Sequence, residues 1–238
     1  MLLLFREGQR PDAAALREAV REAGRITITH EFVGDGATVG LELLRDGMTY
    51  DVAGLVPAPS VATPAARHQY GLGGADGADA LEAVSLQPGP HLQAGARSMP
   101  VVRTMAGIAA DLLGALPAAV AVMWPPSRSY IGPGFFAASV SAWLSGGAFP
   151  ALGLTAFDDE PGGGMRSEGL AWFTGQELLI APDLAKDRAA AARLAIRLVN
   201  QLVSQGRLIA SEVIVGPDGG RLALEPTRDG GTIRIRRA

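Results

Sequence analysis

The sequence has 238 residues, 48% of them hydrophobic and 19% charged, which provides enough apolar material for a full core and excludes disorder of the whole chain. Its formal net charge of −3 excludes a global basic field of the kind that attracts nucleic acid. It contains no cysteine, which excludes disulfides and thiolate chemistry and favours a reducing compartment, so we expect a cytoplasmic protein.

The first 56 residues carry the patterns of strands around one amphipathic helix. The apolar segment at 2–5 is followed directly by Arg6, so it is too short for the apolar core of a signal peptide and predicts a first strand. A helix is predicted from Pro11, with apolar residues at i, i+3, i+4 and i+7, and Gly24 ends it. Further strands are predicted over three ranges, 26–31, 37–44 and 49–56.

Residues 57–90 form the least regular part of the sequence. Prolines and a run of glycines over 71–77 interrupt any periodic pattern, so we expect a flexible loop that proteases cleave first. Two short elements fit its sequence, a helix at 78–85 within it and a closing strand at 91–95 after it.

The middle of the chain is strongly apolar but does not predict a membrane span. A helix expected at 98–113 is apolar on nearly every side, so it should lie buried between layers. A strand at 118–124 and a helix at 135–145 follow. Glycines and prolines interrupt the uncharged stretch 129–157, and its helix is shorter than the roughly 20 residues that a span requires.

The last part of the chain is predicted to hold strands on both sides of one long helix. Asp183 is a suitable N-cap for a helix over 184–205, and Gly206 ends it. The strands are predicted over six ranges, 151–157, 166–173, 177–180, 211–215, 221–225 and 232–236.

The order of strand, helix, strand and hairpin recurs in the second half, which indicates an internal repeat. The turn at 45–47, for example, corresponds to the turn at 173–175. The predicted fold is α+β, with two ferredoxin-like (βαββαβ) units in tandem forming a pseudo-dimer around a buried connecting helix. The expected boundaries are 1–96 for the first unit with its flexible loop 57–90, 97–116 for the connecting helix, and 117–238 for the second unit with extra C-terminal strands.

Three passages resemble a known family, the uncharacterised bacterial proteins of domain-of-unknown-function family 4261. They are AVAVMWPPS at 119–127 with the preceding alanine, SEGLAWFTGQELLIAPD at 167–183, and LAIRLVNQLVSQG at 194–206. The resemblance is close from residue 96 to the C-terminus and looser before it, and residues 57–90 depart from it most. Because this family has no established activity, the resemblance implies no catalytic residues.

Residue spacing gives no assembled reaction centre. His30, His68 and His91 lie far apart in the sequence and lack a helical two-histidine spacing, so no metal site is predicted. The glycines at 71–77 lack the Lys-Ser/Thr pair of a phosphate-binding loop, and those at 162–164 are expected to join two strands. No catalytic residue, metal or cofactor is therefore assigned.

One candidate ligand site remains, on the predicted second unit. In a ferredoxin-like unit the first two strands run parallel, so the loops that follow them emerge at one edge. This places the aromatic and basic segment that ends at Tyr130 beside an acidic turn, and Arg128 would bind an anionic group there. The candidate residues are Trp124, Ser127, Arg128, Tyr130, Asp158, Asp159 and Glu160. An exposed ion pair, a solvated acidic turn and a rigid Pro-Pro loop explain the same residues without a ligand.

We therefore expect a non-catalytic binding or protein-interaction module rather than an enzyme. The alternative that stays open is a small-molecule enzyme or ligand sensor that uses the edge with Trp124–Tyr130 and Asp158–Glu160, and it requires a deep pocket there. Another protein is the expected partner, not nucleic acid or a membrane. The chain is expected to be a monomer or a weak homodimer.

Overall fold

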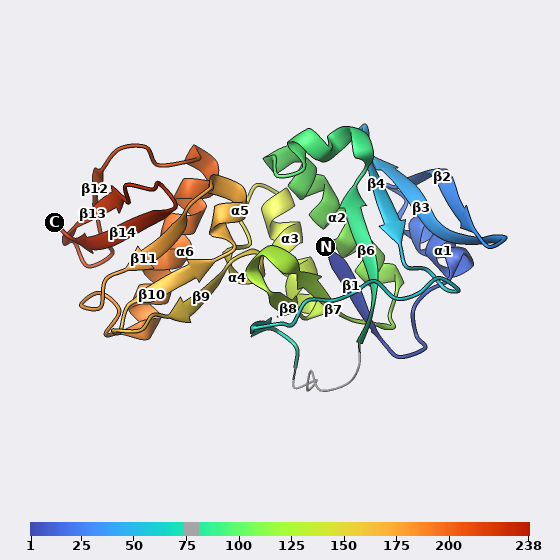
Figure 1. The fold of residues 1–238 in the computed structure, drawn as a ribbon, viewed down its shortest axis with the longest axis horizontal. Coiled ribbons are helices and arrows are strands. Elements are labelled where there is room, and N and C mark those ends of the chain that lie inside the picture. Colours follow the sequence, from blue (N-terminus) through green and yellow to red (C-terminus); the bar gives the residue numbers. More distant parts are fainter. Residues whose placement is uncertain (74–80) are drawn as a thin grey trace. The chain divides into compact units, whose positions relative to one another are not determined.

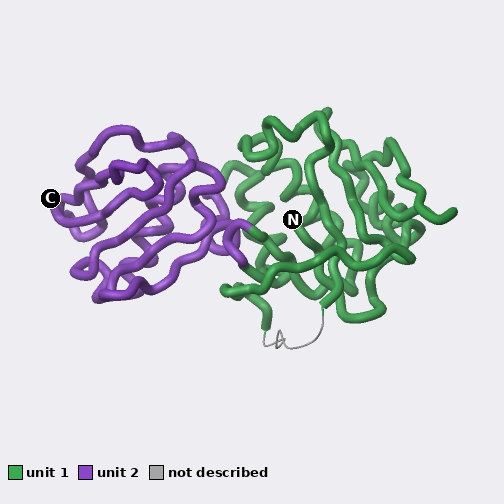
Figure 2. Tube along the Cα trace, viewed as in Figure 1, with its two compact units in different colours: residues 1–125, 129–147 green, residues 126–128, 148–238 purple. Residues whose placement is uncertain are grey.

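The computed structural model describes residues 1–73 and 81–238 and has an α+β fold with two sheets (Figure 1). The chain divides into two compact units (Figure 2). Unit 1 comprises residues 1–125 and 129–147, and unit 2 comprises residues 126–128 and 148–238. None of the helices in the described residues is long and apolar enough to cross a membrane.

Unit 1 is built on a sheet with the strand order β2-β3-β4-β6-β1-β7-β8-β5. Its strands are β1 (Leu2–Arg6), β2 (Thr27–Gly34), β3 (Ala37–Arg45), β4 (Met48–Ala53), β5 (His68–Tyr70), β6 (Leu81–Pro88), β7 (Ala119–Trp124) and β8 (Ser129–Ile131). Its helices are α1 (Ala13–Ala23), the 3-10 turn η1 (Pro90–Gly95), α2 (Met99–Ala115) and α3 (Pro133–Leu144), and a second 3-10 turn, η2 (Pro125–Ser127), bridges the unit boundary.

The sequence signals at the first helix are confirmed. Asp12 precedes α1, and its Oδ1 accepts a hydrogen bond from the Ala15 amide at 2.8 Å. Gly24 ends the helix with a φ of +66°, a left-handed conformation that costs glycine little. The buried face of α1 is the predicted apolar stripe, which includes Leu16, Ala19 and Val20.

Strand β1 lies at the centre of the sheet and is buried over Leu2–Phe5. Both of its neighbours, β6 and β7, pair with it antiparallel, so they run parallel to each other on either side of it. Helix α2 connects these two strands. The predicted burial of this helix is confirmed, but it links strands of one sheet and does not connect two units.

In the described part of residues 57–90, 57–67 is irregular as predicted, but strands β5 and β6 were not predicted. Within it, β6 pairs with both β1 and β4, and its residues Ala83, Val84 and Leu86 are at most 1% exposed. The prediction of a helix at 78–85 is wrong for residues 81–85, which belong to strand β6. Residues 78–80 lie outside the described residues. The strand expected at 91–95 is the 3-10 turn η1. An eight-residue strand between turn formers is short, so the flanking signals obscured it.

Unit 2 has a second sheet with the order β12-β13-β14-β11-β10-β9. Its strands are β9 (Ala156–Asp159), β10 (Met165–Glu168), β11 (Glu177–Ile180), β12 (Glu212–Val215), β13 (Arg221–Pro226) and β14 (Thr232–Arg237). Its helices are the short α4 (Ala151–Leu154) and α5 (Leu170–Thr174) and the long α6 (Arg188–Gln205). Helix α6 buries Leu194, Leu198 and Leu202, and it packs on one face of this sheet (Figure 1).

Three element predictions in unit 2 need correction. The strand expected at 151–157 begins with the turn α4, and only β9 is extended. The strand expected at 166–173 stops at Glu168, because Gly169 adopts a φ of +91° and starts α5. The long helix begins at Arg188, because Asp187, not Asp183, accepts the capping hydrogen bond from the Ala190 amide at 3.0 Å.

The two units do not share one strand order, which the predicted tandem repeat requires. The neighbours of β1 are antiparallel, whereas unit 2 contains the parallel pair β11–β14. Strand β7 and helix α3, expected in a second unit from residue 117, lie in unit 1, and the chain passes into unit 2 for good at residue 148. The physical reason is that β1 is apolar and needs a partner on each side, and β7 supplies the second.

Candidate functional site

The predicted ligand site draws on both units. Trp124 and Tyr130 belong to unit 1, whereas the other five candidate residues belong to unit 2. Strands β7 and β9 lie in different sheets, so the argument that both strands end at one sheet edge is wrong. Trp124 is 2% exposed and packs in the core, and burial raises the pKa of the half-buried Tyr130. Trp124 therefore serves the fold in this structure and is not exposed for stacking on a ligand.

Ser127 and Arg128 have partners within unit 2. The Ser127 hydroxyl is buried and donates to the Gly153 carbonyl at 2.7 Å. Arg128 adopts a φ of +48° and donates from Nε to Glu168 Oε1 at 2.6 Å. Glu168 was not among the predicted residues, because it is the last residue of β10, immediately before Gly169, and no local motif marks it.

The acidic turn takes part in ion pairs with arginines of the same unit. Asp159 lies 3.0 Å from Arg188, and Glu160 lies 3.7 Å from Arg166. Asp158 pairs across the β9–β10 ladder with Arg166. Exposed pairs of this kind contribute at most about 1 kcal/mol each. Asp158 and Asp159 are the last residues of β9, and of the three acidic residues only Asp159 is exposed, so the group is a set of partly paired carboxylates at the end of a strand.

A partly buried carboxylate that sequence reasoning missed lies at the start of β11 in unit 2. Oε1 of Glu177 accepts from the amides of Gly169 and Ala171, each at 2.9 Å, while Oε2 accepts from the Ser167 hydroxyl. Burial raises the pKa of Glu177, and these hydrogen bonds lower it in part. One side chain thus joins β11 to the turn between β10 and α5. The signal in the sequence was the glutamate directly after Thr-Gly-Gln, which the apolar pattern of the following strand overshadowed.

A row of polar side chains crosses four strands of unit 1. His30, Glu42, Asp51 and Gln87 are successive partners in the registers of β2, β3, β4 and β6. Asp51 Oδ1 is buried and has no hydrogen-bond partner. Burial first, and the charge of Glu42 second, raise the pKa of Asp51. The row could not be read from the sequence, because its members come from four separate strands.

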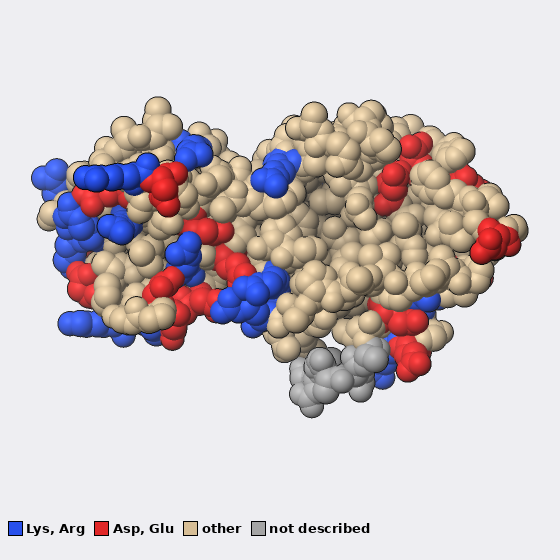
Figure 3. All heavy atoms as spheres, in the orientation of Figure 1, with Lys and Arg blue, Asp and Glu red and all other residues tan. Residues whose placement is uncertain are grey.

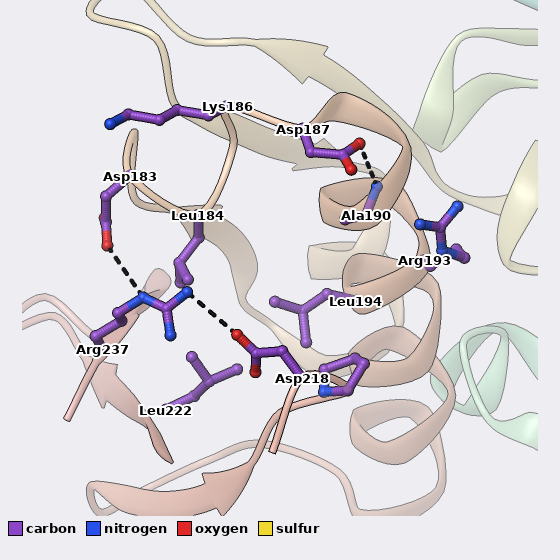
Figure 4. Close-up of a pocket in the computed structure, with 11 residues that line it drawn as sticks. Asp183, Leu184, Lys186, Asp187, Ala190, Arg193, Leu194, Asp218, Leu222 and Arg237 are labelled. Atoms are coloured by element: carbon purple, nitrogen blue, oxygen red, sulfur yellow. Dashed lines mark hydrogen bonds and ion pairs between the residues drawn. The ribbon is translucent and has the colours of Figure 1, made fainter. Parts of the chain in front are cut away.

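A pocket of about 340 Å³ lies beside α6 in unit 2 (Figure 4). Leu184, Leu194 and Leu222 project into it, and charged side chains line its rim. Arg237 bridges the rim, with Nη2 3.2 Å from Asp218 and Nε 3.9 Å from Asp183. The pocket unites the start of α6, the β12–β13 turn and the end of β14, so no contiguous motif marks it.

The edge of the second sheet carries exposed apolar side chains. Strand β12 is an outer strand, and Val213 and Val215 on it are 52% and 59% exposed. Ile209, just before the strand, is 87% exposed. On the face drawn in Figure 3, positive and negative side chains lie intermixed over unit 2. An apolar edge within so charged a unit is typical of a surface that a partner covers.

Comparison with known proteins gave no relative. No family model, curated protein or solved structure matches this chain.

Proposed function

We propose that this chain is a non-catalytic binding module that takes an extended segment of a partner protein onto the free edge of β12. The observation that carries this proposal is the exposure of Val213 and Val215 on an outer strand. Unpaired backbone groups on such a strand form a template for a further strand, and alternate side chains give specificity.

The hydrogen-bond pattern of β12 supports the addition of a strand at its free edge. The Gly216 amide donates to the Gly220 carbonyl at 2.7 Å. Because bonded and non-bonded pairs alternate along an antiparallel ladder, Ile214 and Glu212 then bond to β13. Val213 and Val215 lie between these positions, so their N–H and C=O groups point toward the free edge.

The side chains of β12 indicate the chemistry of the partner. Val213 pairs across the ladder with Ala223, and Ala223 pairs with Arg236, so the valines lie on the face opposite the buried Leu222 and Leu224. An incoming strand would place apolar side chains beside Val213 and Val215. The proposed partner segment is therefore extended, with apolar residues at alternate positions.

Two finer expectations remain part of this proposal. The strand order β4-β6-β1-β7 is the order of a ferredoxin-like unit, with α2 between β6 and β7 and with α1, β2 and β3 between β1 and β4, which supports a ferredoxin-like core for unit 1. Membership of domain-of-unknown-function family 4261 is also proposed. Its three passages coincide with β7 and η2, with β10 to β11, and with the C-terminal two thirds of α6.

The test is co-purification from the source cell with the wild-type chain and with Val213→Lys, because a charged side chain on an edge strand opposes strand addition. Val33→Lys is the matched control, since Val33 is 68% exposed on β2, an outer strand of the other sheet. We expect one partner that wild type and V33K retain and V213K loses. Hydrogen exchange with the recombinant partner should then show slowed exchange at the amides of Val213 and Val215.

Three outcomes would contradict the proposal. They are a partner that V213K retains, a partner that both variants lose equally, and the recovery of no partner at all. If the wild-type chain forms a dimer and V213K dissociates it, the segment bound at β12 belongs to a second copy of this chain and not to another protein.

A further inference from the structure

The pocket beside α6 has the size and apolar floor of a small-molecule site. Its volume, about 340 Å³, falls at the lower end of the range of roughly 300–1,000 Å³ for sites that enclose small ligands. Leu194 and Leu222 are 5% and 1% exposed, so their positions are set by the packing of α6 on the sheet. Pro217 and Ala190 add further apolar surface to the wall. The floor therefore favours the apolar body of a small ligand.

The rim charges decide which ligand fits. Asp183 and Asp218 both lie within ion-pair distance of Arg237, and Asp187 caps α6. Lys186 and Arg193, in contrast, have no hydrogen bond or ion pair with any residue that the structure describes. Of the three rim charges without an ion pair among the described residues, Asp187 accepts the capping hydrogen bond at the N-terminus of α6, and the two that remain available to a ligand, Lys186 and Arg193, are positive.

From these observations we propose that the pocket binds a small organic carboxylate with an apolar body. The body occupies the space between Leu184, Leu194 and Leu222, and the carboxylate reaches the rim at Arg193. A guanidinium binds a carboxylate with two parallel hydrogen bonds, which gives this contact direction as well as charge. Lys186 adds a second positive charge. The site is separate from the β12 edge, so it goes beyond the proposed function and stands or falls without it.

The test uses 1-naphthoate as the probe and 1-naphthylmethanol as its neutral counterpart, titrated calorimetrically into the full chain. Wild type should bind naphthoate about tenfold more tightly than the alcohol, which corresponds to about 1.4 kcal/mol. Arg193→Ala should remove this difference, because it removes the charge that selects the anion. Its matched control is Arg197→Ala, which removes an exposed arginine of the same helix that does not line the pocket.

A second variant tests the apolar floor independently of charge. Ala190→Trp, which places an indole ring at the pocket wall, should abolish the binding of both probes while circular dichroism shows an intact fold. If it fails to fold, the comparison of R193A with R197A still decides the matter. Equal affinities for the two probes, equal effects of R193A and R197A, or no binding at millimolar naphthoate would overturn the proposal.

Discussion

Burial raises the pKa of two carboxyl groups, those of Glu177 and Asp51, but their surroundings differ. Glu177 accepts hydrogen bonds from Ser167, Gly169 and Ala171. Asp51 has one buried oxygen without a partner. A buried acceptor that is satisfied holds structure together, whereas an unsatisfied one costs free energy. The two residues should therefore respond to substitution in opposite directions.

Replacing Glu177 by alanine should lower the free energy of unfolding by about 2–3 kcal/mol, because it leaves a hydroxyl and two amides without their acceptor. Glu177→Gln should cost less, since one amide oxygen remains for Gly169 and Ala171. Urea denaturation followed by the fluorescence of the three tryptophans, one of which is Trp172 in the adjacent α5, measures both. An alanine variant as stable as wild type would show that these hydrogen bonds do not anchor the turn.

Replacing Asp51 by asparagine should raise the melting temperature at pH 7 by about 2 °C, because it removes a partly buried charge beside Glu42. The sign follows from the raised pKa of Asp51: its ionised form costs stability above the folded pKa, and protonation relieves that cost as the pH falls. The gain should therefore shrink between pH 7 and pH 4.

The control for Asp51 is Asp35→Asn. Asp35 lies in the β2–β3 turn with a φ of +49°, a conformation that asparagine also adopts. The substitution Asp35→Asn removes the same charge from an exposed position. A gain from D51N that stays constant with pH, or that D35N equals, would contradict the role assigned to burial.

At the scale of elements, local signals placed the long helices and most strands, but they gave the wrong element type for several short segments and often the wrong boundary. The long helix shows the limit. Asp183 was the predicted N-cap, but Asp187, a residue of the same type, accepts the hydrogen bond from the first turn. Asp183 instead lies 3.9 Å from Arg237, a residue more than fifty positions away. Sequence spacing could not tell a cap from an ion-pair partner.

This choice between the two aspartates is directly testable. Asp187→Ala should lower the free energy of unfolding by about 1 kcal/mol, the usual loss on removing a cap. Asp183→Ala removes the same charge but only an exposed ion pair, so it should cost less than about 0.5 kcal/mol. Thermal denaturation of both variants decides this, and the opposite ranking would restore the earlier helix start.

At the scale of the whole molecule, the class of fold was predictable and the connections were not. The alternation of strand and helix patterns correctly indicated an α+β protein with more than one unit. The repeat argument then failed at β7, because similar element order does not fix which strands become neighbours. The sheet-edge argument for the candidate site failed with it, since that argument placed the residues on one edge of a sheet that β7 and β9 do not share.

By itself the sequence determined the local structure of this protein: the apolar first strand, the amphipathic α1 with its end at Gly24, the buried α2, and the closing strands with their glycine turns. Periodicity, capping and turn chemistry act within a few residues, so they can be read without the fold. Only the tertiary structure decided that β6 is a central strand, that Glu177 anchors a turn, and that β12 is left with a free edge. Strand pairing and burial join residues far apart in the chain, and their free energy depends on the whole sheet.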